Sequence, residues 1–113
     1  LLKKNNLKVS DIAVWEIHEA FASQVLANIR LMSDKNFLKE RLNLDESFTE
    51  VPMEQINVYG GSLSLGHPFA ATGARLLQTA ALRLQASGKQ YAVVSGCAAG
   101  GHGSAILLKN PVV

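Results

Sequence analysis

Apolar residues recur at helical spacing in two stretches of the chain. Residues 18–32 carry an apolar residue at intervals of three or four, which predicts an amphipathic helix over that range. A second helix is expected over residues 69–86, where the apolar stripe is wider. Pro68 suits a first helical position, and Gly88 suits the position just beyond the helix end. The two stripes are Phe21, Val25, Ile29 and Met32, and Phe69, Gly73, Leu76, Leu77, Ala80, Ala81 and Leu84.

Four short apolar runs, at residues 11–17, 56–59, 91–95 and 104–108, predict β-strands. Together with the helices they give the order strand, helix, strand, helix, strand, strand. This order predicts a layered α/β fold in which helices flank a mostly parallel sheet with an antiparallel last strand. A length of 113 residues suits one small domain.

Residues 33–54 interrupt this pattern. The stretch is rich in charged residues of both signs and carries little apolar periodicity. We therefore expect a solvated surface insertion, with one or two helical turns near residues 37–42.

The composition excludes several classes of protein. Hydrophobic content of 48% with 18% charged residues is typical of a soluble globular chain. No apolar run reaches the ~20 residues that a membrane span needs. A net charge of +2 gives no argument for nucleic acid binding. The single cysteine excludes an internal disulfide framework and suits a reducing compartment.

The charge is unevenly distributed along the chain. Residues 55–113 contain Arg75, Arg83, Lys89 and Lys109 but no carboxylate. A positive half could favour an anionic substrate such as a CoA thioester. The interpretation that we favour is that this half is mostly buried core and therefore poor in charge.

Two glycine-rich stretches carry the candidate chemistry. His67 lies within Gly60–Arg75, and Cys97 begins Cys97–Gly103. Histidine and cysteine can both exchange protons near neutral pH, and neighbouring glycines allow close approach of a ligand. His18, His67 and Cys97 each follow a predicted strand, so a parallel sheet would bring them to one crevice at the same sheet edge. The pattern indicates part of an acyl-transfer site.

Each candidate also has a purely structural interpretation. His67 could pack locally in a turn, Cys97 could be an inert buried thiol, and His18 could cap a helix. Glu19 would then interact with the helix dipole, and His102 would be a loop residue. No metal site is expected, because no close pair of ligands has the usual zinc spacing. The glycine pattern also lacks the signature of a phosphate-binding loop. Two motifs that bracket one strand-helix-strand unit favour the functional interpretation.

Three stretches in this order resemble the C-terminal motifs of thiolases: His18–Ala22, Gly60–Arg75 and Cys97–Gly103. Thiolases are acyltransferases that cleave 3-ketoacyl-CoA with CoA, or run the reverse condensation. Residues 1–113 are thus expected to be a C-terminal thiolase domain that lacks its N-terminal part. Thiolases usually begin the first motif with Asn. His18 at that position resembles the β-subunits of mitochondrial trifunctional proteins and their bacterial counterparts in fatty-acid β-oxidation.

The resemblance implies a role for each site residue. His67 would deprotonate a nucleophilic cysteine, and Cys97 would be the acid/base that protonates the departing acetyl-CoA carbanion. His18 and Gly100 would hold a water or stabilise the oxyanion, and Gly66 and Phe69 would contact the substrate. The family's nucleophilic cysteine belongs to its N-terminal domain. The 113-residue chain alone is therefore not expected to be active.

The resemblance also implies partners. CoA and acyl-CoA would be substrates, with no permanently bound cofactor. The rest of the thiolase polypeptide, a second copy and a multifunctional α-subunit would be protein partners. Location would be mitochondrial, with the bacterial cytoplasm or the peroxisome as alternatives. A central strand would precede Leu1, so the sheet would lack its middle member. The alternatives left open are a catalytically silent interaction fragment and a related condensing enzyme of the thiolase superfamily.

Overall fold

A three-stranded mixed sheet forms the centre of the computed structural model, which describes all 113 residues. Strands β1 (Ile12–Ile17), β2 (Tyr91–Ala98) and β3 (His102–Lys109) lie in that order. β1 pairs with β2 in parallel, and β3 pairs with β2 antiparallel. The α/β class and the antiparallel last strand are confirmed. The sheet is evenly mixed, however, with one parallel pair and one antiparallel pair.

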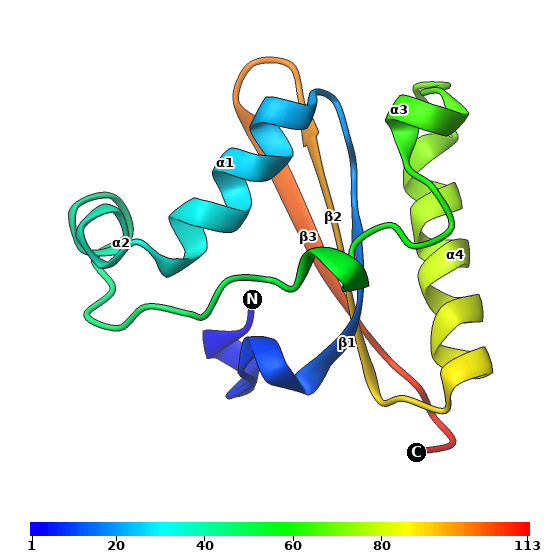
Figure 1. The fold of residues 1–113 in the computed structure, drawn as a ribbon, viewed down its shortest axis with the longest axis horizontal. Coiled ribbons are helices and arrows are strands. Elements are labelled where there is room, and N and C mark those ends of the chain that lie inside the picture. The colour runs from blue at the N-terminus through cyan, green and yellow to red at the C-terminus, as the bar shows by residue number, and fades with distance from the viewer.

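Helices cover both faces of this sheet (Figure 1). Helix α4 lies along one face, while α1 and α2 lie on the opposite side. The helices are α1 (Ala22–Ser33), α2 (Lys35–Leu42), α3 (Ser62–Leu65) and α4 (Thr72–Ser87), with single 3₁₀ turns at Lys3–Asn5, Val9–Asp11 and Met53–Gln55. No helix is both long enough and apolar enough to cross a membrane.

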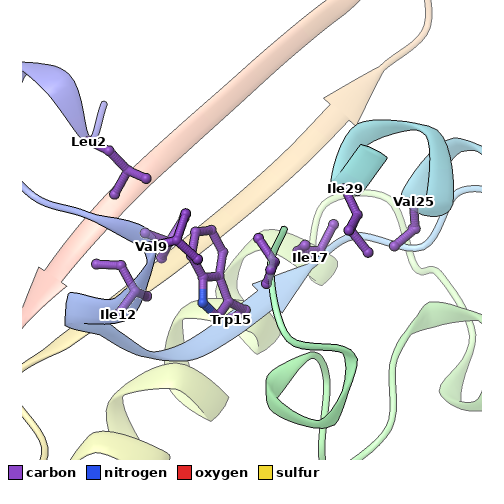
Figure 2. Packing of buried hydrophobic residues seen from close by; sticks show 9 residues of the cluster. Leu2, Val9, Ile12, Trp15, Ile17, Val25 and Ile29 are labelled. Carbon is purple, nitrogen blue, oxygen red and sulfur yellow. The ribbon is translucent and has the colours of Figure 1, made fainter. Parts of the chain in front are cut away.

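The alternation of side chains along β1 and β2 creates two separate cores. Trp15 and Val93 point toward α1, whereas Val14, Ala92 and Val94 pack against Leu76, Ala80 and Leu84 of α4. Figure 2 shows Val25 and Ile29 of α1 beside Ile17 of β1. Strict alternation would place Ile12 on the same face as Val14, beside α4. Ile12 instead belongs to the core on the α1 side, because the pairing register shifts between Ile12 and Val14.

Helix α1 begins later than the pattern predicted. The chain bends at Ala20, Phe21 has an extended backbone, and the helix starts at Ala22 rather than at His18. The reason is that the His18 N–H donates to the Ser95 carbonyl at 2.8 Å, which continues the pairing between β1 and β2. Val25 and Ile29 are buried as expected, but Phe21 is 71% exposed.

The predicted strand at residues 56–59 is wrong. Ile56 makes a single parallel bridge with Trp15, and the chain then turns away. Asn57 adopts a positive φ of 46°, and the Gly60 N–H donates to the Asn57 carbonyl at 2.8 Å. A tight turn thus replaces the expected strand pairing, and this turn leads into the short helix α3.

Helix α4 starts at Thr72, so Pro68 is not its first residue and Phe69 is not part of its stripe. Before the helix, the N–H groups of Ala71 and Thr72 both donate to the Pro68 carbonyl, at 2.9 and 3.0 Å. The predicted C-cap is confirmed, since Gly88 has a φ of 62°.

The charged segment at residues 33–54 is anchored rather than wholly solvated. Its expected helical turns are confirmed as α2, whose outer face is exposed. Leu38 and Val51 are nevertheless only 4% and 2% exposed. Val51 belongs to the core beneath α1.

The expectation of a missing middle strand is also wrong for this structure. β1 pairs directly with β2 from Val14 opposite Ala92 to Ile17 opposite Ser95. β2 therefore occupies the centre of the sheet, and β1 and β3 are its edges.

A buried ion pair joins β1 to α4. Glu16 Oε1 accepts a hydrogen bond from Arg83 Nη1 at 2.7 Å, and the two side chains are 1% and 9% exposed. Arg83 also donates to the carbonyls of Trp15 and Gln55, at 3.3 and 3.0 Å. Burial raises the pKa of the Glu16 carboxyl, and the adjacent Arg83 guanidinium opposes that shift. Arg83 is therefore the group that stabilises the ionised form of the buried Glu16 carboxyl.

We expect Arg83→Met to lower the free energy of unfolding by about 3–5 kcal/mol, because it leaves the Glu16 carboxylate buried without a cation. Urea unfolding measures the change. The double variant Glu16→Gln/Arg83→Met should lose less than the single variant. An Arg83→Met protein as stable as the wild type would contradict this account.

Candidate active site

A pocket of about 360 Å³ opens at the carboxyl ends of β1 and β2. The structure brings His18, His67 and Cys97 together in its wall, although they lie far apart in the sequence. The residues that line it are His18, His67, Phe69, Thr72, Gly73, Leu76, Gly96, Cys97, Ala98, His102, Gly103 and Ser104.

His18 is the buried member of the site. It directly follows β1, is 4% exposed, and its Nδ1 lies 2.9 Å from the Ser62 hydroxyl. Desolvation lowers the pKa of His18, and electrostatic interactions with the His67 ring and the Arg75 guanidinium lower it further. Glu19 opposes this shift only in part. His18 is therefore held as a neutral imidazole around neutral pH.

His67 lies beside His18, with 4.2 Å between the ring centroids. Its Nδ1 is 2.6 Å from the Thr72 hydroxyl, and that hydroxyl donates to the Pro68 carbonyl at 3.2 Å. A hydroxyl has one proton, so Thr72 accepts from His67 Nδ1–H. The hydrogen-bond network thus assigns the proton of a neutral His67 to Nδ1 and leaves Nε2 as a lone pair.

Two predicted substrate-binding residues frame His67. Gly66 has a φ of 92°, which suits glycine, and it ends α3 so that the chain turns into the pocket. Gly66 itself does not line the pocket, whereas Phe69 does. The Phe69 ring is 88% exposed and lies 5.0 Å from the His67 ring, measured between centroids.

Cys97 lies within β2 rather than after it, paired with Gly103 of β3, and its free thiol is exposed. Gly100 has a φ of 88° in the turn between these strands and does not line the pocket. Gly96 and Gly103 line it instead. His102 also lines it and opens β3, so the expectation of a simple loop residue is wrong.

Glu19 has a different role from the one expected. It precedes α1, so it does not act on the dipole of that helix. Its Oε1 accepts from Asn57 Nδ2 at 2.7 Å, and its Oε2 accepts from the Leu63 N–H at 3.0 Å. A Cβ at Gly61 would lie within 2.2 Å of this carboxylate. Glu19 therefore fastens α3 against the end of β1.

Sequence reasoning missed the hydroxyls of Ser62 and Thr72, both of which contact a histidine ring. The available signal was that both are small polar residues within the glycine-rich motif around His67. No group of three or more His, Cys, Asp or Glu side chains has an arrangement that could hold a metal ion.

The family assignment follows from the whole sequence. Residues 1–110 match the family described as "Thiolase, C-terminal domain". The chain belongs to the thiolase family.

Named relatives agree with this membership. A probable 3-ketoacyl-CoA thiolase of Caenorhabditis elegans is 51% identical over 109 residues, which cover 96% of this chain and 24% of the relative. The mitochondrial trifunctional enzyme subunit beta of Mus musculus is 46% identical over 109 residues, covering 96% and 23%. This chain therefore spans about a quarter of the length of either thiolase relative.

A solved thiolase shares the fold. The crystal structure of human mitochondrial 3-ketoacyl-CoA thiolase in complex with CoA matches with a TM-score of 0.72 at 33% identity. The match covers 96% of this chain and 23% of the human chain.

Gly61→Ala tests the fastening of α3 by Glu19. The new methyl would collide with the carboxylate, so we expect a loss of about 1–3 kcal/mol in the free energy of unfolding. Gly73→Ala is the matched control, because no atom lies within 4 Å of a Cβ there and the position is helical. It should be neutral or stabilising by up to about 1 kcal/mol. Equal effects of the two substitutions would contradict the proposed contact.

The lowered pKa of His18 predicts a pH dependence of stability. The folded-state pKa lies below the ordinary value of 6.5, so between these values the unfolded chain binds more protons than the folded one. The contribution of neutral His18 is complete above that ordinary value and is lost as the pH falls through the folded-state pKa. Urea midpoints measured from pH 7.5 downward should decline less steeply in a His18→Asn variant. Parallel declines in both proteins would contradict the assignment.

Proposed function

We propose that this chain is the C-terminal catalytic part of a 3-ketoacyl-CoA thiolase, an acetyl-CoA C-acyltransferase of fatty-acid β-oxidation. The observation that carries the proposal is the shared pocket of His18, His67 and Cys97 in a chain of the thiolase family. The names of the relatives support this substrate class, and the CoA complex of the human enzyme supports CoA as a substrate.

The residues divide the reaction between them. His67 Nε2 takes the proton of a cysteine thiol that the rest of the polypeptide supplies, and the thiolate attacks the 3-keto carbon. The C2–C3 bond breaks, and its electron pair passes to C2 of the departing acetyl-CoA. Cys97 donates its thiol proton to that carbon. The Cys97 thiolate takes the thiol proton of free CoA, whose sulfur attacks the acyl-enzyme. The nucleophilic cysteine leaves and regains its proton from His67, so acyl-CoA forms and both cysteines and His67 return to their starting states.

The remaining site residues bind and stabilise. His18 holds the water or oxygen on which negative charge develops, and one such donor is typically worth about 3 kcal/mol. The Gly100 N–H would assist only if the turn between β2 and β3 came closer to the substrate, because Gly100 lies outside the pocket wall. Phe69 at the rim and the backbone around Gly66 would contact acyl-CoA.

The partners follow from the same proposal. CoA and acyl-CoA bind as substrates, and no cofactor is permanently bound. The protein works as a homodimer. It also associates with a multifunctional α-subunit, which agrees with the name of the mouse relative as a subunit beta. Location is mitochondrial for a protein of the trifunctional type, with the bacterial cytoplasm or the peroxisome as the alternatives.

In the full-length enzyme, Cys97→Ala should abolish thiolysis and condensation but leave acylation of the nucleophilic cysteine by acyl-CoA intact. The reason is that Cys97 must donate a proton to C2 in thiolysis and remove one from C2 in condensation, whereas CoA can leave as a thiolate during acylation. Mass spectrometry detects the acyl-enzyme, and acetyl-CoA formation reports turnover. Loss of acylation with surviving condensation would overturn the role of Cys97. A wild-type protein with no turnover would instead favour a catalytically silent module.

A further inference from the structure

The Ser62 hydroxyl lies between a cation and an imidazole. Arg75 Nη2 donates to Ser62 Oγ at 3.0 Å, and His18 Nδ1 lies 2.9 Å from the same oxygen. Ser62 and His18 are only 7% and 4% exposed. Water therefore has little access to this contact, and the three groups must satisfy one another.

The direction of the hydrogen bonds follows from the chemistry of the three groups. A guanidinium can only donate, so the Ser62 oxygen accepts from Arg75. The single hydroxyl proton then has His18 Nδ1 as its only acceptor within hydrogen-bond distance. If His18 donated instead, the buried hydroxyl proton would have no acceptor, which is costly. Arg75 thus drives the Ser62 proton toward Nδ1 and places the ring proton of His18 on Nε2.

The neighbouring histidine has the opposite arrangement. The Thr72 hydroxyl donates its proton to the Pro68 carbonyl and accepts a hydrogen bond from His67 Nδ1–H. Two hydroxyls thereby impose opposite tautomers on two rings whose centroids are 4.2 Å apart. His67 presents a lone pair at Nε2, and His18 presents an N–H at Nε2.

We propose that Ser62, oriented by Arg75, is a positioning residue that fixes His18 as an Nε2–H donor toward the reacting oxygen. The inference rests on the proposed thiolase function and deepens it. With the opposite tautomer, His18 would present a lone pair to an oxygen that is gaining negative charge. Ser62 therefore determines whether His18 assists the reaction or opposes it.

A double-mutant cycle in the full-length enzyme tests this role. Ser62→Ala should lower kcat for thiolysis at least about 10-fold with a smaller change in KM, since the lost interaction orients a group that acts in the transition state. In a His18→Asn background the same substitution should cost less than about 3-fold, because an amide has no ring tautomer to fix. Thiolases usually carry Asn at this position, so that background should keep measurable turnover.

Ser64→Ala is the matched control. Ser64 lies in the same short helix, but its hydroxyl donates to the Gly61 carbonyl at 3.1 Å and touches neither histidine. We expect wild-type kcat within about 2-fold, because a surface substitution of this kind changes little. A Ser62→Ala loss of equal size in both His18 backgrounds would show that Ser62 only supports the fold and would overturn the proposal.

A second measurement separates this proposal from the proposed function. In ¹⁵N-histidine-labelled full-length protein, His18 Nδ1 should resonate as an unprotonated nitrogen and Nε2 as a protonated one. Ser62→Ala should mix or reverse the two signals, while those of His67 stay unchanged. A protonated Nδ1 in the wild type overturns the positioning role whether or not the enzyme turns over. Absence of turnover with the expected tautomer overturns only the thiolase proposal.

Discussion

The site depends on the way Asn57 holds the edge of β1. Its backbone N–H donates to the Trp15 carbonyl at 2.9 Å. Its side-chain amide then accepts from the Ile17 N–H and donates to the Ile17 carbonyl, both at 2.8 Å. The amide thus provides the pairing that a neighbouring strand would otherwise give. These hydrogen bonds of Asn57 form a clamp that holds Ile17, the last residue of β1, directly before His18. Asn57 also begins the turn that leads to Ser62.

Glu19 extends the same clamp to α3. One carboxylate oxygen accepts from the Asn57 side-chain amide and the other accepts from the Leu63 N–H, so the turn at Asn57 and the start of α3 bind the same carboxylate. Gly61 is required because its missing side chain leaves space for that carboxylate. The hydrogen bonds of Asn57 and Glu19 therefore help to bring together His18 and Ser62, which are 44 positions apart in the sequence.

The uneven charge of the sequence has a structural explanation. Arg83 pairs with buried Glu16, and Arg75 donates to Ser62, so two of the four cations beyond residue 54 serve internal contacts. This supports the interpretation of a core poor in charge over that of a positive surface for an anionic ligand. Arg75 also contributes to the lowered pKa of His18, which links the charge pattern to the site.

The strands and helices that could be predicted from the sequence are those whose apolar periodicity reflects burial in the core. The sequence predicted β1 and β2 because their side chains fill two cores, and it placed Gly88 at the end of α4 because a left-handed cap favours glycine. It failed at residues 18–21 and 56–59, where polar contacts override the apolar pattern. At the first, the backbone continues the sheet and Glu19 is used elsewhere. At the second, a side-chain amide replaces a strand.

The candidate site shows the same division. His67 and Cys97 were identifiable because two glycine-rich motifs with reactive side chains bracket one strand-helix-strand unit. Ser62 and Thr72 were not, because the direction of a hydroxyl proton depends on its other partner, here Arg75 and the Pro68 carbonyl. Such partners become visible only when the chain is folded.

The two rings also constrain each other electrostatically. In the proposed reaction His67 becomes a cation when it accepts a proton, and its ring centroid lies 4.2 Å from that of His18. A charged His18 would oppose that step, since like charges at this separation repel each other. Burial, which is the main cause of the low pKa of His18, keeps that ring neutral and removes the repulsion. The burial of His18 thus favours the proton transfer that is proposed for its neighbour.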